Sequence, residues 1–206
     1  MGNRKNKKLK ILAAADIHGD STITKTLAEK AEKQSVDLVI LCGDITGFVN
    51  TKNIIKPFRD KNKEVFLIPG NHDFPAAIDF LAKYYKMKNL HEYSLEFQNV
   101  GFFGTGHANL SPLSKAFENE MFKGLKRAHS YIKNMQKKIM ITHMHPFKSL
   151  SEASGFEGSH AITKAIKQFK PDILLHGHIH EAAGVEELIG NTRVLNVGRE
   201  GKIIEI

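Results

Sequence analysis

Short, mostly apolar runs recur along the chain, and their length predicts the strands of a buried sheet. The five clearest runs occupy residues 11–15, 38–41, 65–68, 139–142 and 173–175. A strand that is covered on both faces is apolar at nearly every position, so a continuous run bounded by turn residues is typical of it.

Amphipathic segments separate these runs and predict five helices, over residues 21–34, 51–60, 74–85, 114–134 and 159–169. We expect Ser21 or Thr22 to cap the first helix and Asp73 to cap the third. The alternation of strands and helices is typical of βαβ units, which favour an α/β fold with a parallel sheet.

Two regions depart from this alternation. Residues 93–97 and 100–103 predict a β-hairpin. Residues 184–188, 192–197 and 202–206 are short runs separated by glycine-containing turn signals, and they predict a β meander.

The composition fits one domain, over residues 1–206, with residues 1–8 as a candidate disordered basic N-terminus. No apolar run approaches the roughly 20 residues that span a bilayer, and the basic start has no long apolar segment of a secretory signal. The single cysteine excludes an internal disulfide framework. We therefore expect a cytoplasmic protein without membrane contact, and no pattern in the sequence sets its oligomeric state.

The chain carries a net charge of +8 and has a pI of about 9.4. Such a balance raises affinity for polyanions, including nucleic acid. The cations are spread over the N-terminus and the predicted helices, so solvated helix faces are the favoured interpretation and a nucleic-acid surface is the alternative.

Each of the five apolar runs leads into a cluster of residues that can bind metal. These residues are Asp16 and His18, Asp44, Asn71 and His72, His143 and His145, and His178 and His180. Of the 11 histidines, seven lie in or beside these clusters. Because ligands bind beyond the carboxyl ends of strands in open α/β sheets, the clusters predict one shared polar site.

Oxygen and imidazole ligands without thiolates suit Mn²⁺, Fe, Co²⁺, Ni²⁺ or Zn²⁺. Asp16 and His18 are two residues apart, as are His178 and His180, so each pair projects to one side of an extended chain. The set is too large for one tetrahedral zinc, whereas two ions that share a carboxylate would use all of it. Any single cluster is weak evidence, and only their joint occurrence supports the site.

The order of these motifs resembles that of the calcineurin-like metallophosphoesterase superfamily. The matching segments run from Asp16-x-His18 through Gly43-Asp44, Gly70-Asn71-His72-Asp73 and His143 to Gly177-His178-x-His180. Within the superfamily, the chain resembles the small single-domain Icc-like phosphoesterases, which Gly104-Thr105-Gly106 with Ser111-Pro112 also suggests. The resemblance implies a sandwich of two mixed β-sheets flanked by helices, with the site at one edge.

The resemblance also implies a role for each ligand. Asp16, His18 and His180 would hold the first of two divalent ions, Asn71, His143 and His178 would hold the second, and Asp44 would bridge them. His72 would be catalytic, protonating the leaving group while a metal-bridging hydroxide attacks phosphorus in line. The implied substrate is a phosphate ester or nucleotide, with diesters favoured over monoesters.

Three further residues are candidate substrate contacts: His145, His107 and Arg199. For His145, a role in stiffening its loop is an equal alternative, and for Arg199 an exposed surface position is the default. His91, His129 and His160 are interpreted as ordinary surface residues. Two other functions stay open, a nuclease-like enzyme that acts on nucleic acid and a non-catalytic scaffold of the same fold.

Overall fold

The computed structural model describes residues 8–47, 51–107 and 115–206, so most of the expected basic N-terminus lies outside the described residues. One sheet has the strand order β11-β1-β2-β3-β4. Its strands are β1 (Lys10–Ala14), β2 (Leu38–Cys42), β3 (Glu64–Ile68), β4 (Lys88–Asn89) and β11 (Lys202–Glu205). All neighbours in this sheet are parallel except β11, which runs antiparallel to β1.

The second sheet has the order β5-β6-β7-β8-β10-β9. Its strands are β5 (Ser94–Phe97), β6 (Val100–Thr105), β7 (Lys137–Thr142), β8 (Ile173–His176), β9 (Glu186–Ile189) and β10 (Thr192–Asn196). The four central strands are parallel, and each edge strand is antiparallel to its neighbour.

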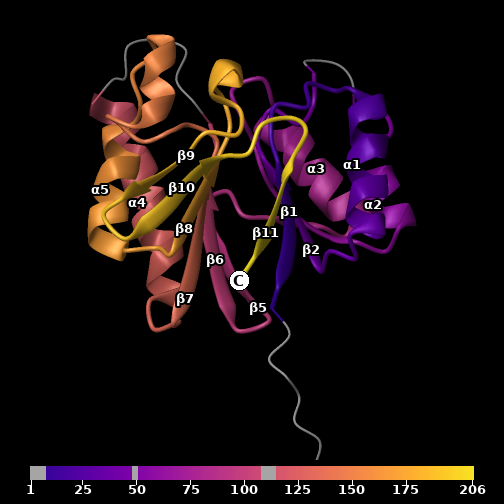
Figure 1. Ribbon diagram of the computed structural model, residues 1–206, viewed down its shortest axis with the longest axis horizontal. Coiled ribbons are helices and arrows are strands. Elements are labelled where there is room, and N and C mark those ends of the chain that lie inside the picture. The colour runs from indigo at the N-terminus through magenta and orange to yellow at the C-terminus, as the bar shows by residue number, and fades with distance from the viewer. Residues whose placement is uncertain (1–7, 48–50, 108–114) are drawn as a thin grey trace, which may run out of the picture.

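Helices cover the outer face of each sheet (Figure 1). They are α1 (Ser21–Lys33), α2 (Lys56–Asp60) and α3 (Pro75–Tyr85) on the first sheet, and α4 (Lys115–Ile132) and α5 (His160–Phe169) on the second. Two short 3₁₀ helices, η1 (Leu150–Ser154) and η2 (His180–Ala182), lie in the connections. The predicted fold class, two mixed sheets flanked by helices, is confirmed.

The strands are apolar throughout because their alternate residues enter two different cores. In β1, Ile11 and Ala13 pack between the sheets, whereas Leu12 and Ala14 pack under the helices of the first sheet. The second sheet repeats this pattern, with Met140 under α4 and α5. Burial on both faces explains why these strands lack the polar alternation of a half-exposed strand.

Two sequence-based expectations about this architecture are wrong. Asp20, not Ser21 or Thr22, caps α1, because its carboxylate accepts the N–H groups of Thr22 and Ile23. The C-terminal runs do not form a meander, since β9 and β10 pair in the second sheet while β11 crosses to β1 in the first. The short run of β11 contains no feature that selects between the two sheets.

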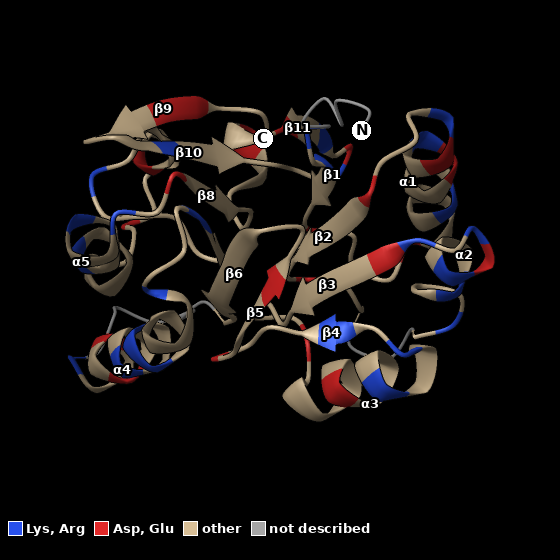
Figure 2. Ribbon diagram, turned by 90° about the horizontal axis from the view of Figure 1, so that it is seen from below, with Lys and Arg blue, Asp and Glu red and all other residues tan. Residues whose placement is uncertain are grey.

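Charged residues lie mostly on the helices and at strand ends, with Lys and Arg interspersed among Asp and Glu (Figure 2). This distribution agrees with solvated helix faces. None of the described helices is both long and apolar enough to cross a lipid bilayer.

Candidate metal centre

The predicted ligands meet where the carboxyl ends of β1, β2 and β3 face those of β7 and β8. Three groups of side chains each bring their ligand atoms within 4.8 Å of one another: Asp16 with His18 and His180, Asp44 with His18 and His72, and Asp44 with Asp16 and His143. The segments that carry them are up to 162 residues apart in sequence. The predicted convergence of these clusters therefore occurs in the structure.

On one side of the cluster, two imidazoles point at each other. The Nε2 atoms of His18 and His180 are 3.2 Å apart, and the Nε2 of His180 lies 3.8 Å from Oδ1 of Asp16. Two ring nitrogens and a carboxylate oxygen around one point form a donor set that suits a divalent cation.

Asp44 lies in the middle of the cluster and is 2% exposed. Its Oδ2 is 3.7 Å from Nε2 of His18 and 3.4 Å from Nε2 of His143. Its Oδ1 accepts the backbone N–H of His72 at 2.8 Å. One oxygen is thus fixed by the backbone, and the other faces imidazoles from both sheets.

On the other side, His143 spans the two sheets. Its Nδ1 donates to the carbonyl oxygen of Cys42 at 2.8 Å, which turns Nε2 towards Asn71 Oδ1 at 3.0 Å. The ring of His178 meets that of His143 edge-on, with centroids 5.2 Å apart. A ring nitrogen held by a backbone carbonyl is the usual support of a metal-binding histidine.

Burial and neighbouring charges shift the pKa values of the residues in this cluster. Burial by itself would lower the pKa of His143, but the hydrogen bond and charge of Asp44 outweigh it and raise this pKa to about 9. Burial opposes the charge of Asp44 too, but His143 holds its pKa at about 2. Burial, followed by the nearby His143, lowers the pKa of His178 to about 3, so this imidazole is neutral and ready to bind metal.

Burial raises the pKa of Asp16, with the nearby Asp44 carboxylate adding to the effect. Two buried carboxylates in one cluster are costly unless cations compensate them. The residues present therefore fit divalent metal ions by ligand type, burial and mutual approach.

Four of the predicted ligands adopt left-handed backbone conformations. The φ angles are 57° for Asp16, 50° for His18, 50° for Asp44 and 73° for His178. We expected Asp16 and His18 to project to one side of an extended chain, and likewise His178 and His180. This expectation is wrong, because the strands end before these residues. Such conformations are unfavourable for residues other than glycine and cluster at functional sites.

Two glycines of the motifs are required by close approach to the carboxylates. A Cβ on Gly70 would lie 2.1 Å from Oδ1 of Asp44, and one on Gly177 would lie 2.7 Å from Oδ2 of Asp16. Any side chain at either position would displace the carboxylate, which explains why glycine precedes Asn71 and His178.

Asp73 does not cap α3, as the sequence suggested, because Phe74 is the N-cap residue and makes no side-chain cap. The buried carboxylate instead accepts the N–H groups of Ile45, Thr46 and Gly70 and the hydroxyl of Thr46, at 2.7 to 3.0 Å. Asp73 thus ties the loop after Asp44 to the loop that carries Asn71 and His72.

The three candidate substrate contacts lie in different surroundings. His145 is fully buried, and its Nε2 donates to the carbonyl of Phe156 at 3.1 Å, which is the loop-stiffening arrangement. The His107 ring packs edge-on against His91, with centroids 4.9 Å apart. Arg199 is half-exposed, with Nη2 3.5 Å from a carboxylate oxygen of Asp20.

Sequence reasoning missed two residues at the site. Phe156 and Glu181 line a pocket of about 270 Å³, together with His18, Asp44, Asn71, His72, His178, Ile179 and His180. The Phe156 side chain is 63% exposed. Phe156 follows no strand-like run and belongs to no motif, so nothing local marks it, whereas Glu181 directly follows His180 and could have been included.

Comparison of the sequence with protein-family models identifies its family. A sequence model of the calcineurin-like phosphoesterases matches residues 9–182. The chain belongs to this family. It is therefore a metal-dependent phosphoesterase, and the resemblance seen in the motifs is confirmed. A search of curated proteins finds no match to the sequence.

Solved structures share the fold of this phosphoesterase. TT1561 of Thermus thermophilus is 19% identical, with a TM-score of 0.75 over 96% of this chain and 99% of that one. An archaeal phosphodiesterase is also 19% identical, with a TM-score of 0.56 over 96% and 99%. A dimetal phosphatase from Danio rerio is 12% identical, with a TM-score of 0.60 over 93% and 88%.

Proposed function

We propose that the protein is a dinuclear metal-dependent phosphodiesterase. The observation that carries the proposal is the position of Asp44 between two sets of donor atoms, 3.7 Å from His18 on one side and 3.4 Å from His143 on the other. A carboxylate with imidazoles on both sides is suited to bridge two ions, since the complete donor set exceeds what one ion needs.

Asp16, His18 and His180 are the proposed ligands of one ion, and Asn71, His143 and His178 those of the other. The donor set of oxygen and imidazole nitrogen accepts Mn²⁺, Fe, Co²⁺, Ni²⁺ or Zn²⁺. Divalent ions held there supply Lewis-acid chemistry, which acidifies a water molecule and stabilises charge on phosphoryl oxygens.

His72 is the proposed proton donor to the leaving oxygen. Its backbone is fixed through Asp44, while its ring is 35% exposed and lines the pocket over the cluster. An imidazole at the mouth of the pocket, within reach of substrate, can act as a general acid towards the leaving oxygen. The ring is 3.9 Å from Oδ2 of Asp44, so metal binding by His72 is the competing assignment.

A diester is favoured as substrate because the mouth of the pocket is open. The exposed ring of Phe156 and a second, larger cavity beside His180 offer contacts for groups on either side of the phosphorus. The similarity in fold to an archaeal phosphodiesterase agrees with this preference. Phosphate-ester small molecules or nucleotides are the proposed substrates.

The test compares hydrolysis of bis-p-nitrophenyl phosphate and p-nitrophenyl phosphate. Chelator-treated protein is reloaded separately with Mn²⁺, Ni²⁺, Co²⁺ or Zn²⁺, and metal content is measured in parallel. Asp44→Asn is the inactive variant, and Asp60→Asn, an exposed carboxylate on α2, is its matched control. We expect metal-dependent cleavage, faster for the diester, in wild type and Asp60→Asn but not in Asp44→Asn.

Equal activity of Asp44→Asn, or one bound ion per chain at saturation, would refute the dinuclear proposal. A nuclease-like activity is the second candidate, and the net charge of +8 is the observation that favours it. That activity requires binding of DNA or RNA that weakens steeply with salt, so negligible binding at low salt removes it.

A further inference from the structure

One buried amide side chain joins two backbone segments next to the metal centre. Asn196 is the last residue of β10 and is 1% exposed. Its Nδ2 donates to the carbonyl oxygen of Ile179 at 2.8 Å, and its Oδ1 accepts the N–H of Gly198 at 3.2 Å. A buried amide that makes both bonds to the backbone fixes the segments that it joins.

The first of these segments carries His180. The carbonyl of Ile179 belongs to the peptide group that leads into His180, and it also accepts the N–H of Ala182 at 3.2 Å. Ile179 is 3% exposed and is the N-cap residue of η2. The orientation of this peptide group therefore decides where the side chain of His180 begins.

His180 depends on its backbone more than His143 does. Its side chain is 57% exposed, and its Nε2 faces His18 and Asp16 at 3.2 and 3.8 Å. Within the described part of the chain, no hydrogen bond holds its other ring nitrogen, whereas Nδ1 of His143 donates to Cys42. A metal-binding histidine usually has such a bond, so His180 needs another means of orientation.

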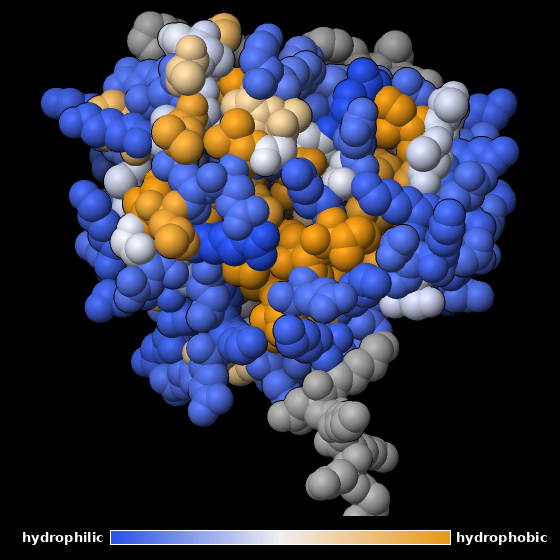
Figure 3. All heavy atoms as spheres, in the orientation of Figure 1, coloured by the Kyte–Doolittle hydropathy of each residue, from blue (hydrophilic) through white to orange (hydrophobic). Residues whose placement is uncertain are grey.

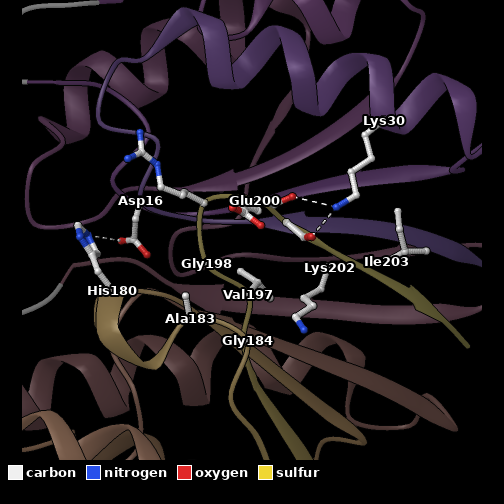
Figure 4. A pocket seen from close by; sticks show the side chains of 12 residues that line it. Asp16, Lys30, His180, Ala183, Gly184, Val197, Gly198, Glu200, Lys202 and Ile203 are labelled. Atoms are coloured by element: carbon white, nitrogen blue, oxygen red, sulfur yellow. Dashed lines mark hydrogen bonds and ion pairs between the residues drawn. The ribbon is translucent and has the colours of Figure 1, made fainter.

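The second segment leads to Asp16. The carbonyl of Gly198 accepts the N–H of Ala15, the residue before Asp16, at 3.0 Å. Here the chain crosses from β10 in the second sheet to β11 in the first (Figure 1). Figure 4 shows Asp16 and His180 pointing toward each other from opposite sheets, with Gly198 nearby. Asn196 thus connects the segment of His180 to that of Asp16.

The surroundings of Asn196 are apolar. Its neighbour Val197 is 2% exposed and packs between the sheets. Apolar residues also fill the hollow between the two sheets on the face shown in Figure 3. An amide buried in such surroundings costs free energy if its donor or acceptor is unpaired. Asn196 therefore favours the one arrangement of both segments that satisfies it.

We propose that Asn196 is a positioning residue for the ion held by Asp16, His18 and His180. It keeps two segments that carry ligands, one from each sheet, at a fixed separation, and it is not itself a ligand. The inference rests on the proposed function, because it uses the same assignment of ligands. Its effect falls mainly on this ion, since His143 is oriented separately by Cys42.

Metal binding to the full-length protein tests this role without using turnover. Calorimetry and mass spectrometry measure the affinity and number of bound Mn²⁺ ions in wild type, Asn196→Ala and Asn196→Leu. Leucine has the branched shape of asparagine, so it removes both hydrogen bonds without leaving a cavity. We expect one ion to bind about 10- to 100-fold more weakly in both variants, the usual effect of removing a residue that supports a ligand.

Thr192→Val is the matched control. Thr192 begins the same strand and is 2% exposed, and its hydroxyl donates to the carbonyl of Pro171 at 2.7 Å. The substitution therefore removes a buried hydrogen bond to the backbone at the end of β10 opposite to Asn196. We expect lower stability to denaturant but wild-type affinity for both ions. Circular dichroism checks that each variant is folded at the temperature of the titration.

The absorption spectrum of bound Co²⁺ identifies which ion is affected. His180→Ala and His143→Ala each remove one proposed ligand, from different ions, so they assign the Co²⁺ bands to the two sites. Asn196→Leu should alter the bands that are lost in His180→Ala and keep those that are lost in His143→Ala. A general loosening of the fold would alter both sets of bands.

The outcomes separate the inference from the proposed function. A single ion in wild type at saturation would refute the dinuclear proposal, and the affinity for that ion in Asn196→Leu, compared with Thr192→Val, would still decide the inference. Wild-type affinity for both ions in the Asn196 variants would overturn the inference alone. Equal losses in Asn196→Leu and Thr192→Val would overturn it as well, because Asn196 would then act only on the fold.

Discussion

His72 is positioned by its backbone and leaves its ring at the mouth of the site. The N–H group of His72 donates to Oδ1 of Asp44, and the ring lines the same pocket as Asn71 and His178. The geometry also groups its Nε2 with His18 and Asp44 as possible metal ligands. A substitution of His72 that keeps this backbone hydrogen bond can therefore distinguish a role as proton donor from a role as metal ligand.

We predict that His72→Asn lowers kcat by about 10²–10⁴-fold, which is the usual contribution of a general acid, while metal content stays unchanged. The asparagine keeps the N–H group that fixes Asp44. Metal analysis by mass spectrometry and kinetics with a diester check both parts. Loss of one ion per chain in His72→Asn would instead make His72 a ligand.

Asp73 connects the loop that follows Asp44 to the loop that carries Asn71 and His72. Its carboxylate accepts four donors from Ile45, Thr46 and Gly70, and it is 6% exposed. We predict that Asp73→Ala destabilises the fold by about 1–3 kcal/mol or more, because buried N–H groups lose their acceptor. Metal affinity should fall too, since Asp44 and Asn71 lie in the tied loops.

Denaturant unfolding and metal titration of Asp73→Ala measure these two effects. Asp60→Ala is the control, because its exposed carboxylate forms an ion pair with Lys56 on the same helix. If Asp73→Ala keeps both wild-type stability and wild-type metal affinity, the tie between the loops has no energetic importance.

At the scale of elements, the connection between η1 and α5 carries an aromatic ring to the metal centre. His145 donates to the carbonyl of Phe156, and the N–H of Ser159 donates to the carbonyl of His145 at 2.9 Å. The side chain of Ser159 caps α5 by accepting the N–H of Ile162. The segment is thus fixed on both sides of Phe156, which supports the stiffening role of His145.

We predict that Phe156→Ala raises KM for diesters with an aryl leaving group by about two- to tenfold, the equivalent of one aromatic contact. Methyl and ethyl esters should be affected less, because they offer little surface to the ring. Phe80→Ala, an exposed aromatic on α3, is the matched control. An equal rise in KM for all esters would indicate displacement of the loop instead of a contact.

For the whole molecule, the main feature is that the proposed ligands come from both sheets. Asp16, His18, Asp44 and Asn71 follow strands of the first sheet, and His143, His178 and His180 follow strands of the second. The two sheets also share one apolar core. We propose that they form a single domain, and that bound ions add a second connection between its halves.

We predict that a chelator lowers the midpoint of thermal unfolding, because ions that bind only the folded protein stabilise it by mass action. A hundredfold excess over Kd corresponds to about 2.7 kcal/mol. Calorimetry with and without added Mn²⁺ or Zn²⁺ measures the shift, which should shrink in Asp44→Asn. An unchanged midpoint on chelation would contradict a connection through the ions.

The sequence by itself determined most of the elements and indicated the residues proposed as metal ligands. Continuous apolar runs marked the principal strands, and helical periodicity marked α1, α3, α4 and α5, because burial on one or both faces leaves a local pattern. The predicted ligands meet because parallel strands bring their carboxyl ends to one edge.

Tertiary structure decided what depends on segments far apart in the chain. Asp73 has a good capping position, but two of its partners, Ile45 and Thr46, lie 28 and 27 residues away. Strand β11 likewise pairs with β1, at the opposite end of the chain. The carbonyl of Phe156 is held by the side chain of His145, which lies 11 residues earlier. Such contacts depend on how distant segments pack together, so no local sequence pattern could have predicted them.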